Sequence, residues 1–342
     1  MNTNNLSSFE VQRATRASMV GGVIALVALA VAISLPWWGG RADMRLVGEF
    51  CYYLALAQFW NLLAGYAGLV SVGQQAFVGL GGYALFLLAA KVGLHPLAAI
   101  PLAGVFAALF AIPTAYLVFR LKGAYFAIGT WVVAEVYRLG FAQVESLGGG
   151  SGMTLPISVV KEIANGRTAR EMTVYFVALA LAVAVTAFIY WLLRSRWGLA
   201  LTAIRDSEPA AESLGVRNMA TKYLIYLVAA FGTGVTGALI FLSKLRIAPE
   251  AAFSVQDWTA NIIFIVVIGG IGRIEGPIIG TLLFFLLREF LSDFGTWYMI
   301  FLGAVAVVVM LKAPQGLWGL FAERFDIQLF PVQRKLIVKN EH

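Results

Sequence analysis

The sequence has little charge and very few side chains of the kinds that bind metals or form disulfides. Asp, Glu, Lys and Arg make up 13% of the 342 residues, against roughly 25% in soluble domains. Cys51 is the only cysteine, so no disulfide can form within the chain. The only histidines, His95 and His342, are too few for a histidine-based metal site. These absences exclude a large soluble domain and predict that the chain holds no metal.

Motifs for catalysis and for nucleotide binding are also missing. The sequence has no Gly-Lys pair and hence no P-loop, and it contains neither GxSxG nor HExxH. Two histidines leave almost no material for a Ser-His-Asp triad. We therefore expect a protein that is not an enzyme and binds no cofactor itself. The formal charge of +7 comes without a basic patch with interleaved aromatic residues, so nucleic acid is not an expected partner.

Apolar residues are abundant and make up 60% of the chain. Runs of about 20 apolar residues recur along its length, and each can cross a bilayer core of roughly 30 Å. The first run follows Arg13 and Arg16 and lacks a small-residue cleavage pattern, which favours a retained span over a signal peptide. The predicted fold class is an all-α integral membrane protein of about ten transmembrane helices. The predicted spans are 18–37, 46–64, 76–92, 97–119, 123–141, 172–193, 222–243, 257–272, 276–291 and 296–311.

Lys and Arg are unequally divided between the two sides that these spans define. Fifteen lie on the side of the termini and nine on the other side, with Arg138 inside a span. Because Lys and Arg gather in cytoplasmic loops, the count places both termini in the cytoplasm. The chain, 1–342, is then one transmembrane domain with a cytoplasmic N-terminal segment (1–17), an external loop (142–171), a cytoplasmic loop (194–221) and a cytoplasmic tail (312–342). The external loop is interpreted either as a flexible connection or as a docking surface.

Two Gly-rich stretches break the helical pattern inside apolar runs, at 65–83 and at 269–280. Glycine in a span lets helices pack closely or lets the backbone unwind around a cavity. The GxxxG spacing of Gly276 and Gly280 favours packing, whereas packing alone does not require the polar residues within the first stretch. Amide side chains here either bond to neighbouring helices or face a polar channel. The candidates for a translocation path in these stretches are Asn61, Gly65, Gly68, Ser71, Gln74, Gln75, Gly269 and Gly272.

Glu135 and Arg138 are charged residues within a predicted span. An isolated charge near the middle of a membrane costs about 2.5–3.5 kcal/mol. Their i, i+3 spacing puts them on one face of a helix, where they can neutralise each other. They are interpreted either as a structural ion pair or as part of the lining of the translocation path. A proton-coupled carrier usually needs several such groups in a relay, and here one pair stands alone.

A charged segment, GLALTAIRDSEPAAESLGV at 198–216, lies between two predicted spans. Asp206 or Ser207 can cap a helix with Pro209 in its first turn, which predicts about two helical turns over 208–214. The polar face of this helix is acidic, whereas helices on a membrane surface are usually rich in Lys and Arg. A docking helix for another protein is therefore favoured over a helix that rests on the bilayer.

Two motifs carry a family resemblance. The first, G-x-x-S-x-G-x-x-A-F-x-x-x-G-x-Y, comprises Gly68, Ser71, Gly73, Ala76, Phe77, Gly81 and Tyr83. The second, A-I-R-D-x-E-x-A-A-E-x-x-G, begins at Ala203 and ends at Gly215. With IGGIGRIEGPIIG at 268–280, they resemble the permease subunits of ATP-binding-cassette importers of the branched-chain amino acid family, of the LivM type. The resemblance extends over about 45–320; the departures from the family pattern, at Leu69, Gln74, Thr202 and Pro209, bear on the solute more than on the class.

The resemblance implies a pore subunit of the cell (inner) membrane that works by alternating access. It implies pairing with a second, homologous permease, two cytoplasmic ATPase subunits that use ATP, and an external solute-binding protein. The expected solutes are branched-chain or related amino acids, with urea, short amides or other small solutes as the alternative. A hypothesis from another class is an ion-coupled secondary carrier without ATPases. In the family the second motif is the ATPase-coupling loop, which corresponds here to Ile204, Arg205, Asp206, Glu208, Ala211, Glu212 and Gly215.

Overall fold

The computed structural model describes residues 9–12, 16–291, 294, 297–313, 315–325, 329–331 and 335–338. Each span predicted from the sequence overlaps a helix in these ranges, although 46–64 also includes part of a π-helix and 257–272 is divided between a π-helix, an α-helix and a turn. The helices that overlap these spans are α1 (Arg16–Trp38), α2 (Arg41–Asn61), α3 (Gln74–Ala90), α4 (Pro96–Val118), α5 (Ala124–Ala142), α7 (Arg167–Leu193), α10 (Asn218–Lys244), α12 (Asn261–Gly269), α13 (Glu275–Leu291) and α14 (Trp297–Lys312).

Shorter elements fill the connections. The short α-helices are α6 (Ile157–Ile163), α8 (Arg196–Asp206), α9 (Glu208–Ser213), α11 (Pro249–Ala252) and α15 (Gly316–Phe325). Two π-helices, η1 (Leu62–Tyr66) and η4 (Val255–Ala260), and two 3₁₀-helices, η2 (Glu145–Leu147) and η3 (Gly149–Ser151), adjoin the longer ones. Strand β1 (Phe9–Gln12) pairs antiparallel with β4 (Lys335–Val338), and β2 (Met153–Thr154) pairs antiparallel with β3 (Arg246–Ile247).

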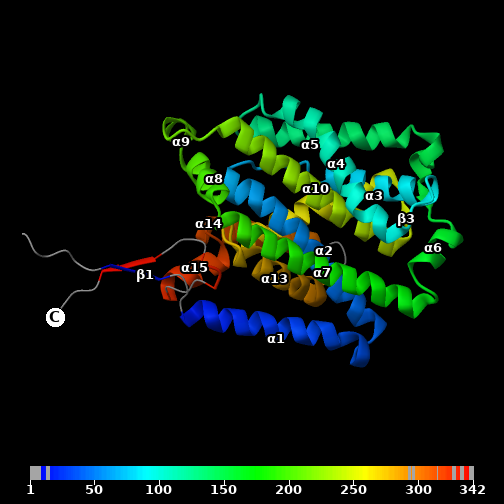
Figure 1. Ribbon diagram of the computed structural model, residues 1–342, viewed down its shortest axis with the longest axis horizontal. Coiled ribbons are helices and arrows are strands. Elements are labelled where there is room, and N and C mark those ends of the chain that lie inside the picture. The colour runs from blue at the N-terminus through cyan, green and yellow to red at the C-terminus, as the bar shows by residue number, and fades with distance from the viewer. Residues whose placement is uncertain are drawn as a thin grey trace, which may run out of the picture.

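The long helices form a bundle with two distinct ends (Figure 1). Helices α8, α9 and α15 gather at one end of the bundle, while α6 and β3 lie at the other. The β1–β4 pair joins the two ends of the chain beside α15. The first and last described segments therefore lie at the same end of the molecule as the charged segment that contains α8 and α9.

Several parts of the chain are suited to cross a membrane by length and composition. They are Ala17–Trp38, Pro96–Val118, Arg167–Leu193, Asn218–Lys244, Pro249–Gly269 and Ile300–Phe325. Helix α2 is not among them because charged residues such as Arg45 and Glu49 lower the hydropathy of its first turns. From Cys51 to Asn61, however, every residue of α2 except Tyr53 is buried, so its second half lies in the bundle core. The architecture is that of an all-α membrane protein.

Glycines bring the central helices into backbone contact. A Cβ atom added to Gly81 of α3 would lie 2.0 Å from the carbonyl oxygen of Gly234 in α10. Likewise, a Cβ at Gly280 of α13 would lie 1.9 Å from the carbonyl oxygen of Ile265 in α12, which confirms packing at the GxxxG spacing. The Gly-rich stretch 65–83 is irregular only in its first part: α3 begins at Gln74, close to the start of the predicted span 76–92, and Gly81 later in the stretch serves close packing.

The connection at 142–171 differs from the flexible loop predicted as one alternative. It contains η2, η3, β2 and α6, and α7 already begins at Arg167. Two residues of it, Met153 and Thr154, pair with Ile247 and Arg246, which ties the connection to the end of α10. The backbone hydrogen bonds of β2 therefore order a segment whose Gly-rich sequence by itself predicts flexibility.

His95 has a structural role at the start of α4. Its Nδ1 accepts a hydrogen bond from the backbone N–H of Leu97 at 3.3 Å and caps the helix. Across the described ranges, no group of three or more His, Cys, Asp or Glu side chains is placed to hold a metal ion.

Candidate functional site

The charged segment between α7 and α10 forms two helices. Helix α9 begins after Ser207, whose side chain accepts a hydrogen bond from the N–H of Ala210 at 3.4 Å, so the predicted short helix is confirmed. Helix α8 was not predicted, although its hydrophobic residues recur at helical spacing. Ile204 and Ala211 are buried, but Leu214 is 80% exposed because α9 ends before it. Leu214 therefore does not belong to the buried face of this segment.

The two acidic residues singled out on α9 have different surroundings. Glu208 forms an ion pair with Lys222 at 2.5 Å, and its carbonyl oxygen accepts a hydrogen bond from Asn218 Nδ2 at 2.7 Å. Both contacts fix α9 to the first turns of α10. Glu212 is exposed, and its side chain has no hydrogen bond or ion pair with any described residue. With Leu214, it offers a free surface at the tip of the segment.

Arg205 connects this segment to the first Gly-rich stretch. Its Nη1 donates a hydrogen bond to the carbonyl oxygen of Gly65 at 3.0 Å, and its Nε donates to Asp206 Oδ1 at 3.0 Å. Gly65 lies in the last turn of η1, where carbonyl groups lack partners within the helix. The guanidinium supplies the missing donor, and Asp206 orients it.

Asn61, the last residue of α2, binds the turn that follows α12. Its Oδ1 accepts a hydrogen bond from the N–H of Gly272 at 2.8 Å, and its Nδ2 donates to the carbonyl oxygen of Arg273 at 2.8 Å. One turn earlier, Gln58 Nε2 donates to the carbonyl oxygen of Ile274 at 3.1 Å. Both amides are fully buried and replace main-chain partners that this irregular turn cannot supply for itself.

The two Gly-rich stretches meet at this point. A Cβ atom added to Gly65 would lie 2.5 Å from the backbone nitrogen of Gly272, and Gly272 has a φ of +75°, which favours glycine. We call the group formed by Asn61, Gly65, Arg205, Gly272 and Arg273 the glycine junction. It joins residues that are predicted for the translocation path with a residue that is predicted for the coupling loop.

Neighbouring elements enclose the glycine junction. Gly68 has a φ of +69°, and a Cβ added to it would be 3.8 Å from Arg205 Cα. Gly269 contacts the carbonyl oxygen of Gly276, so it belongs to the α12–α13 contact. On the outside, Arg273 pairs with Glu323 of α15 at 3.7 Å.

Ser71, Gln74 and Gln75 are buried and make contacts away from the glycine junction. Gln74 Nε2 donates to Thr233 Oγ1 at 2.5 Å, and Gln75 Oε1 accepts a hydrogen bond from Thr259. The carbonyl oxygen of Ser71 accepts a hydrogen bond from Trp60 Nε1 at 2.8 Å. These contacts link α3 to α10 and η4, the role expected of polar groups that hold helices together.

The pair of Glu135 and Arg138 is not isolated, contrary to the prediction. Arg138 binds Glu135 at 2.5 Å and also binds Glu250 of α11 at 2.7 Å. The Glu135 side chain is 42% exposed, and Arg138 lies one turn from the end of α5. The sequence could not show the third partner because Glu250 is distant in the chain. The structure places this cluster near η3 and α11, apart from the glycine junction.

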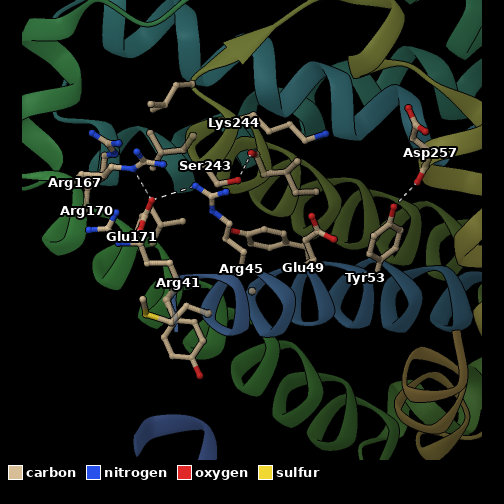
Figure 2. A pocket seen from close by; sticks show the side chains of 18 of the residues that line it. Arg41, Arg45, Glu49, Tyr53, Arg167, Arg170, Glu171, Ser243, Lys244 and Asp257 are labelled. Carbon is tan, nitrogen blue, oxygen red and sulfur yellow. Dashed lines mark hydrogen bonds and ion pairs between the residues drawn. The ribbon is translucent and has the colours of Figure 1, made fainter. Parts of the chain in front are cut away.

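The sequence interpretation also missed a charged cavity at the opposite end of the bundle from α8 and α9. The cavity has a volume of about 700 Å³ and is lined by the first turns of α2 and α7, the end of α10 and part of η4 (Figure 2). The only sequence signal was the set of Lys and Arg residues on the side with fewer basic residues. Within the glycine junction, the sequence interpretation missed Arg273, whose carbonyl oxygen accepts the hydrogen bond from Asn61 Nδ2.

The described residues of the glycine junction include no nucleophile and no acid–base pair, so the junction offers no catalytic chemistry. Instead, Arg205 of α8 hydrogen-bonds Gly65 of η1, the segment that directly follows α2. Because Asn61 joins α2 to the turn after α12, the charged segment and both irregular segments form one continuous set of contacts.

Comparisons with known proteins identify relatives over most of the chain. The family model described as branched-chain amino acid transport system, permease component, matches residues 44–310. The chain is 31% identical over 317 residues to the high-affinity branched-chain amino acid transport system permease protein LivM of Escherichia coli (strain K12), covering 86% of this chain and 74% of the relative. It is 26% identical over 306 residues to the fructose import permease protein FruG of Bifidobacterium longum, covering 86% and 81%. No solved structure matches the chain.

Proposed function

Because the chain belongs to the family of permease components of branched-chain amino acid transport systems, we propose that it is the pore subunit of an ATP-driven importer for branched-chain or related amino acids. It is a multi-pass protein of the inner membrane, and it is a permease rather than an enzyme. Permeases of such importers work with ATPase and solute-binding partners.

In the proposed topology, ten helices cross the membrane and both termini are cytoplasmic. The crossing helices are α1, α2, α3, α4, α5, α7, α10, α12, α13 and α14. The β1–β4 pair supports a common side for the two ends of the chain, and an even number of crossings requires it. The excess of Lys and Arg on that side supports a cytoplasmic location. The segments 1–17, 194–221 and 312–342 then face the cytoplasm, and 142–171 faces outward.

The proposed assembly contains this chain, a second homologous permease, two cytoplasmic ATPases and an external solute-binding protein. The chain itself binds no cofactor, and ATP is used by the ATPase subunits. The exposed Glu212 and Leu214 at the tip of α9 support a protein partner there, because an apolar side chain with 80% exposure gains by being covered.

The observation that carries the proposal is the hydrogen bond from Arg205 to Gly65. It links the proposed ATPase-docking segment to the irregular ends of two core helices. Binding of ATP by the partners would move α8 and α9, and the glycine junction would then shift α2 and the turn after α12 together. That movement is the coupling step that alternating access requires.

The relatives of the chain are named for different solutes. The LivM relatives are named for branched-chain amino acids, whereas FruG is named for fructose, so the relatives as a group span two chemical classes. Urea, short amides and other small solutes remain the alternatives within this class of importer. The alternative from another class is an ion-coupled carrier that acts alone.

Reconstitution into proteoliposomes separates these functions. The chain with its ATPases and binding protein should take up radiolabelled leucine only with ATP, and the chain alone should not. Uptake by the chain alone, driven by an ion gradient, would instead establish the secondary carrier. Fructose uptake without leucine uptake would retain the class and reject the solute.

A further inference from the structure

Charged side chains are concentrated in the charged cavity between α2, α7 and the end of α10. Six basic residues and three acidic residues line it. In the view of Figure 2, Arg167, Arg170 and Glu171 group at one end, Asp257 lies toward the other, and Lys244 lies between them. Its volume of about 700 Å³ is within the range of roughly 300–1,000 Å³ for small-molecule sites.

Two of the acidic residues are already neutralised. Glu171 contacts three guanidinium groups, those of Arg167 at 3.1 Å, Arg45 at 3.3 Å and Arg41 at 3.7 Å. Glu49 pairs with Arg288 at 2.7 Å. Because three arginines share the single charge of Glu171, the end of the cavity near α7 keeps a positive excess.

Three further charged groups lack an ionic partner among the described residues. The Arg170 side chain has no hydrogen bond or ion pair with a described residue. The Lys244 side chain makes only cation–π contacts there, with Nζ 4.8 Å from the Trp258 ring centroid and 5.6 Å from that of Phe241. The carboxylate of Asp257 is free, although its backbone carbonyl accepts a hydrogen bond from Tyr53. The unpaired groups are therefore cations toward one side and a carboxylate toward the other.

In the proposed topology, the basic residues of the cavity lie on the side of the membrane where Lys and Arg are usually scarce. Nine Lys and Arg residues face outward there, against the usual bias toward the cytoplasm. Six of these nine line this one cavity: Arg41, Arg45, Arg167, Arg170, Lys244 and Arg288. Solvation of a loop does not explain why they converge, whereas an anionic group of a ligand does.

We propose that the charged cavity binds a zwitterionic α-amino acid on its way through the permease, an inference that rests on the proposed function. Lys244, which lies between the two ends, receives the α-carboxylate and Asp257 receives the α-ammonium, while Arg170 adds to the positive charge at the far end. Val174, Ile240 and Leu242 line the same cavity and supply an apolar surface for an aliphatic side chain. An uncharged sugar would leave Arg170, Lys244 and Asp257 without an ionic partner, so the cavity favours a ligand that carries both charges.

Equilibrium binding to the permease–ATPase complex without the binding protein tests this site directly. The probes are radiolabelled leucine with competing 4-methylpentanoate, leucinamide and fructose, which carry respectively only the carboxylate, only the ammonium and neither. We expect leucine to bind, 4-methylpentanoate and leucinamide to compete about tenfold or more weakly, and fructose not to compete.

The variants separate the two ends of the ligand. Asp257→Asn should lower the affinity for leucine about tenfold and leave the affinity for 4-methylpentanoate unchanged. The unchanged affinity also shows that the variant is folded. The double variant Arg170→Gln with Lys244→Gln should lower the affinity for both ligands. The matched control is Arg246→Gln, which should lower neither affinity, because Arg246 is an exposed arginine at the same end that does not line the cavity. Equal affinities for all variants, or competition by fructose equal to leucine, would overturn the site. If the wild-type complex shows ATP-driven leucine uptake while this binding pattern fails, only the site is rejected; absent uptake rejects the proposed function itself.

Discussion

Arg205 Nη1 donates a hydrogen bond to the carbonyl oxygen of Gly65, 140 residues earlier in the chain. The contact joins a charged segment outside the bundle to the last turn of a core helix. Gly65 in turn lies against Gly272, and Asn61 holds the turn that contains Gly272. Movement at α8 therefore has a short physical route to two core helices.

Replacing Arg205 with Ala should uncouple uptake from ATP hydrolysis. A hydrogen bond from a charged donor contributes about 1.5–3 kcal/mol, so we expect ATP-driven uptake to fall about tenfold or more while ATPase subunits still assemble with the chain. Arg217→Ala, an exposed arginine of the same segment, serves as the control. Undiminished uptake by Arg205→Ala in proteoliposomes would remove Arg205 from the coupling route.

Charge reversal should act differently at the two acidic residues of α9. Glu212→Lys should reduce co-purification of the ATPases without altering the thermal stability of the chain, because the Glu212 side chain has no hydrogen bond or ion pair with a described residue. Glu208→Lys should lower stability as well, since it places a second cation beside Lys222. The double variant Glu208→Lys with Lys222→Glu should recover stability. Identical behaviour of the two single variants would contradict the distinction.

Gly272→Ala should destabilise the glycine junction. The φ of +75° costs a non-glycine residue about 1–2 kcal/mol, and the added Cβ would lie 3.1 Å from the Gly65 carbonyl oxygen. We expect a lower thermal midpoint in detergent and reduced uptake. Gly303→Ala is the matched control, because its Cβ would meet nothing within 4 Å; a drop of equal size there would show that the effect is not specific.

Asn61→Leu should lower stability more than Asn61→Asp. Leucine leaves both the Gly272 N–H and the Arg273 carbonyl unpaired, at about 1–3 kcal/mol each. Aspartic acid, protonated at acidic pH, keeps an acceptor for the Gly272 N–H and a donor for the Arg273 carbonyl oxygen, so the comparison is made at acidic pH. Differential scanning fluorimetry of both variants, with the partly exposed Asn261→Ala as the control, would measure the order, and a more stable leucine variant would contradict it.

The helices and their approximate ends follow from the sequence, because each apolar run must satisfy its own backbone groups within a membrane. The short helix α9 followed in the same way from local capping by Ser207. In contrast, the contacts of Glu208 with Lys222 and of Arg138 with Glu250 depend on how helices pack. Local pattern does not carry such information, and the interpretation of Glu135 and Arg138 as an isolated pair was therefore wrong.

The sequence by itself determined the membrane class, the helical spans and the absence of a nucleotide-binding motif, since these depend on composition and on short-range periodicity. Only the tertiary structure decided which polar residues meet. It joined Asn61 and Gly65 to Gly272 and Arg205, and it gathered Arg170, Lys244 and Asp257 around one cavity. The physical reason is that unpaired backbone groups and charges find their partners through helix packing across long separations in sequence, which no local pattern specifies.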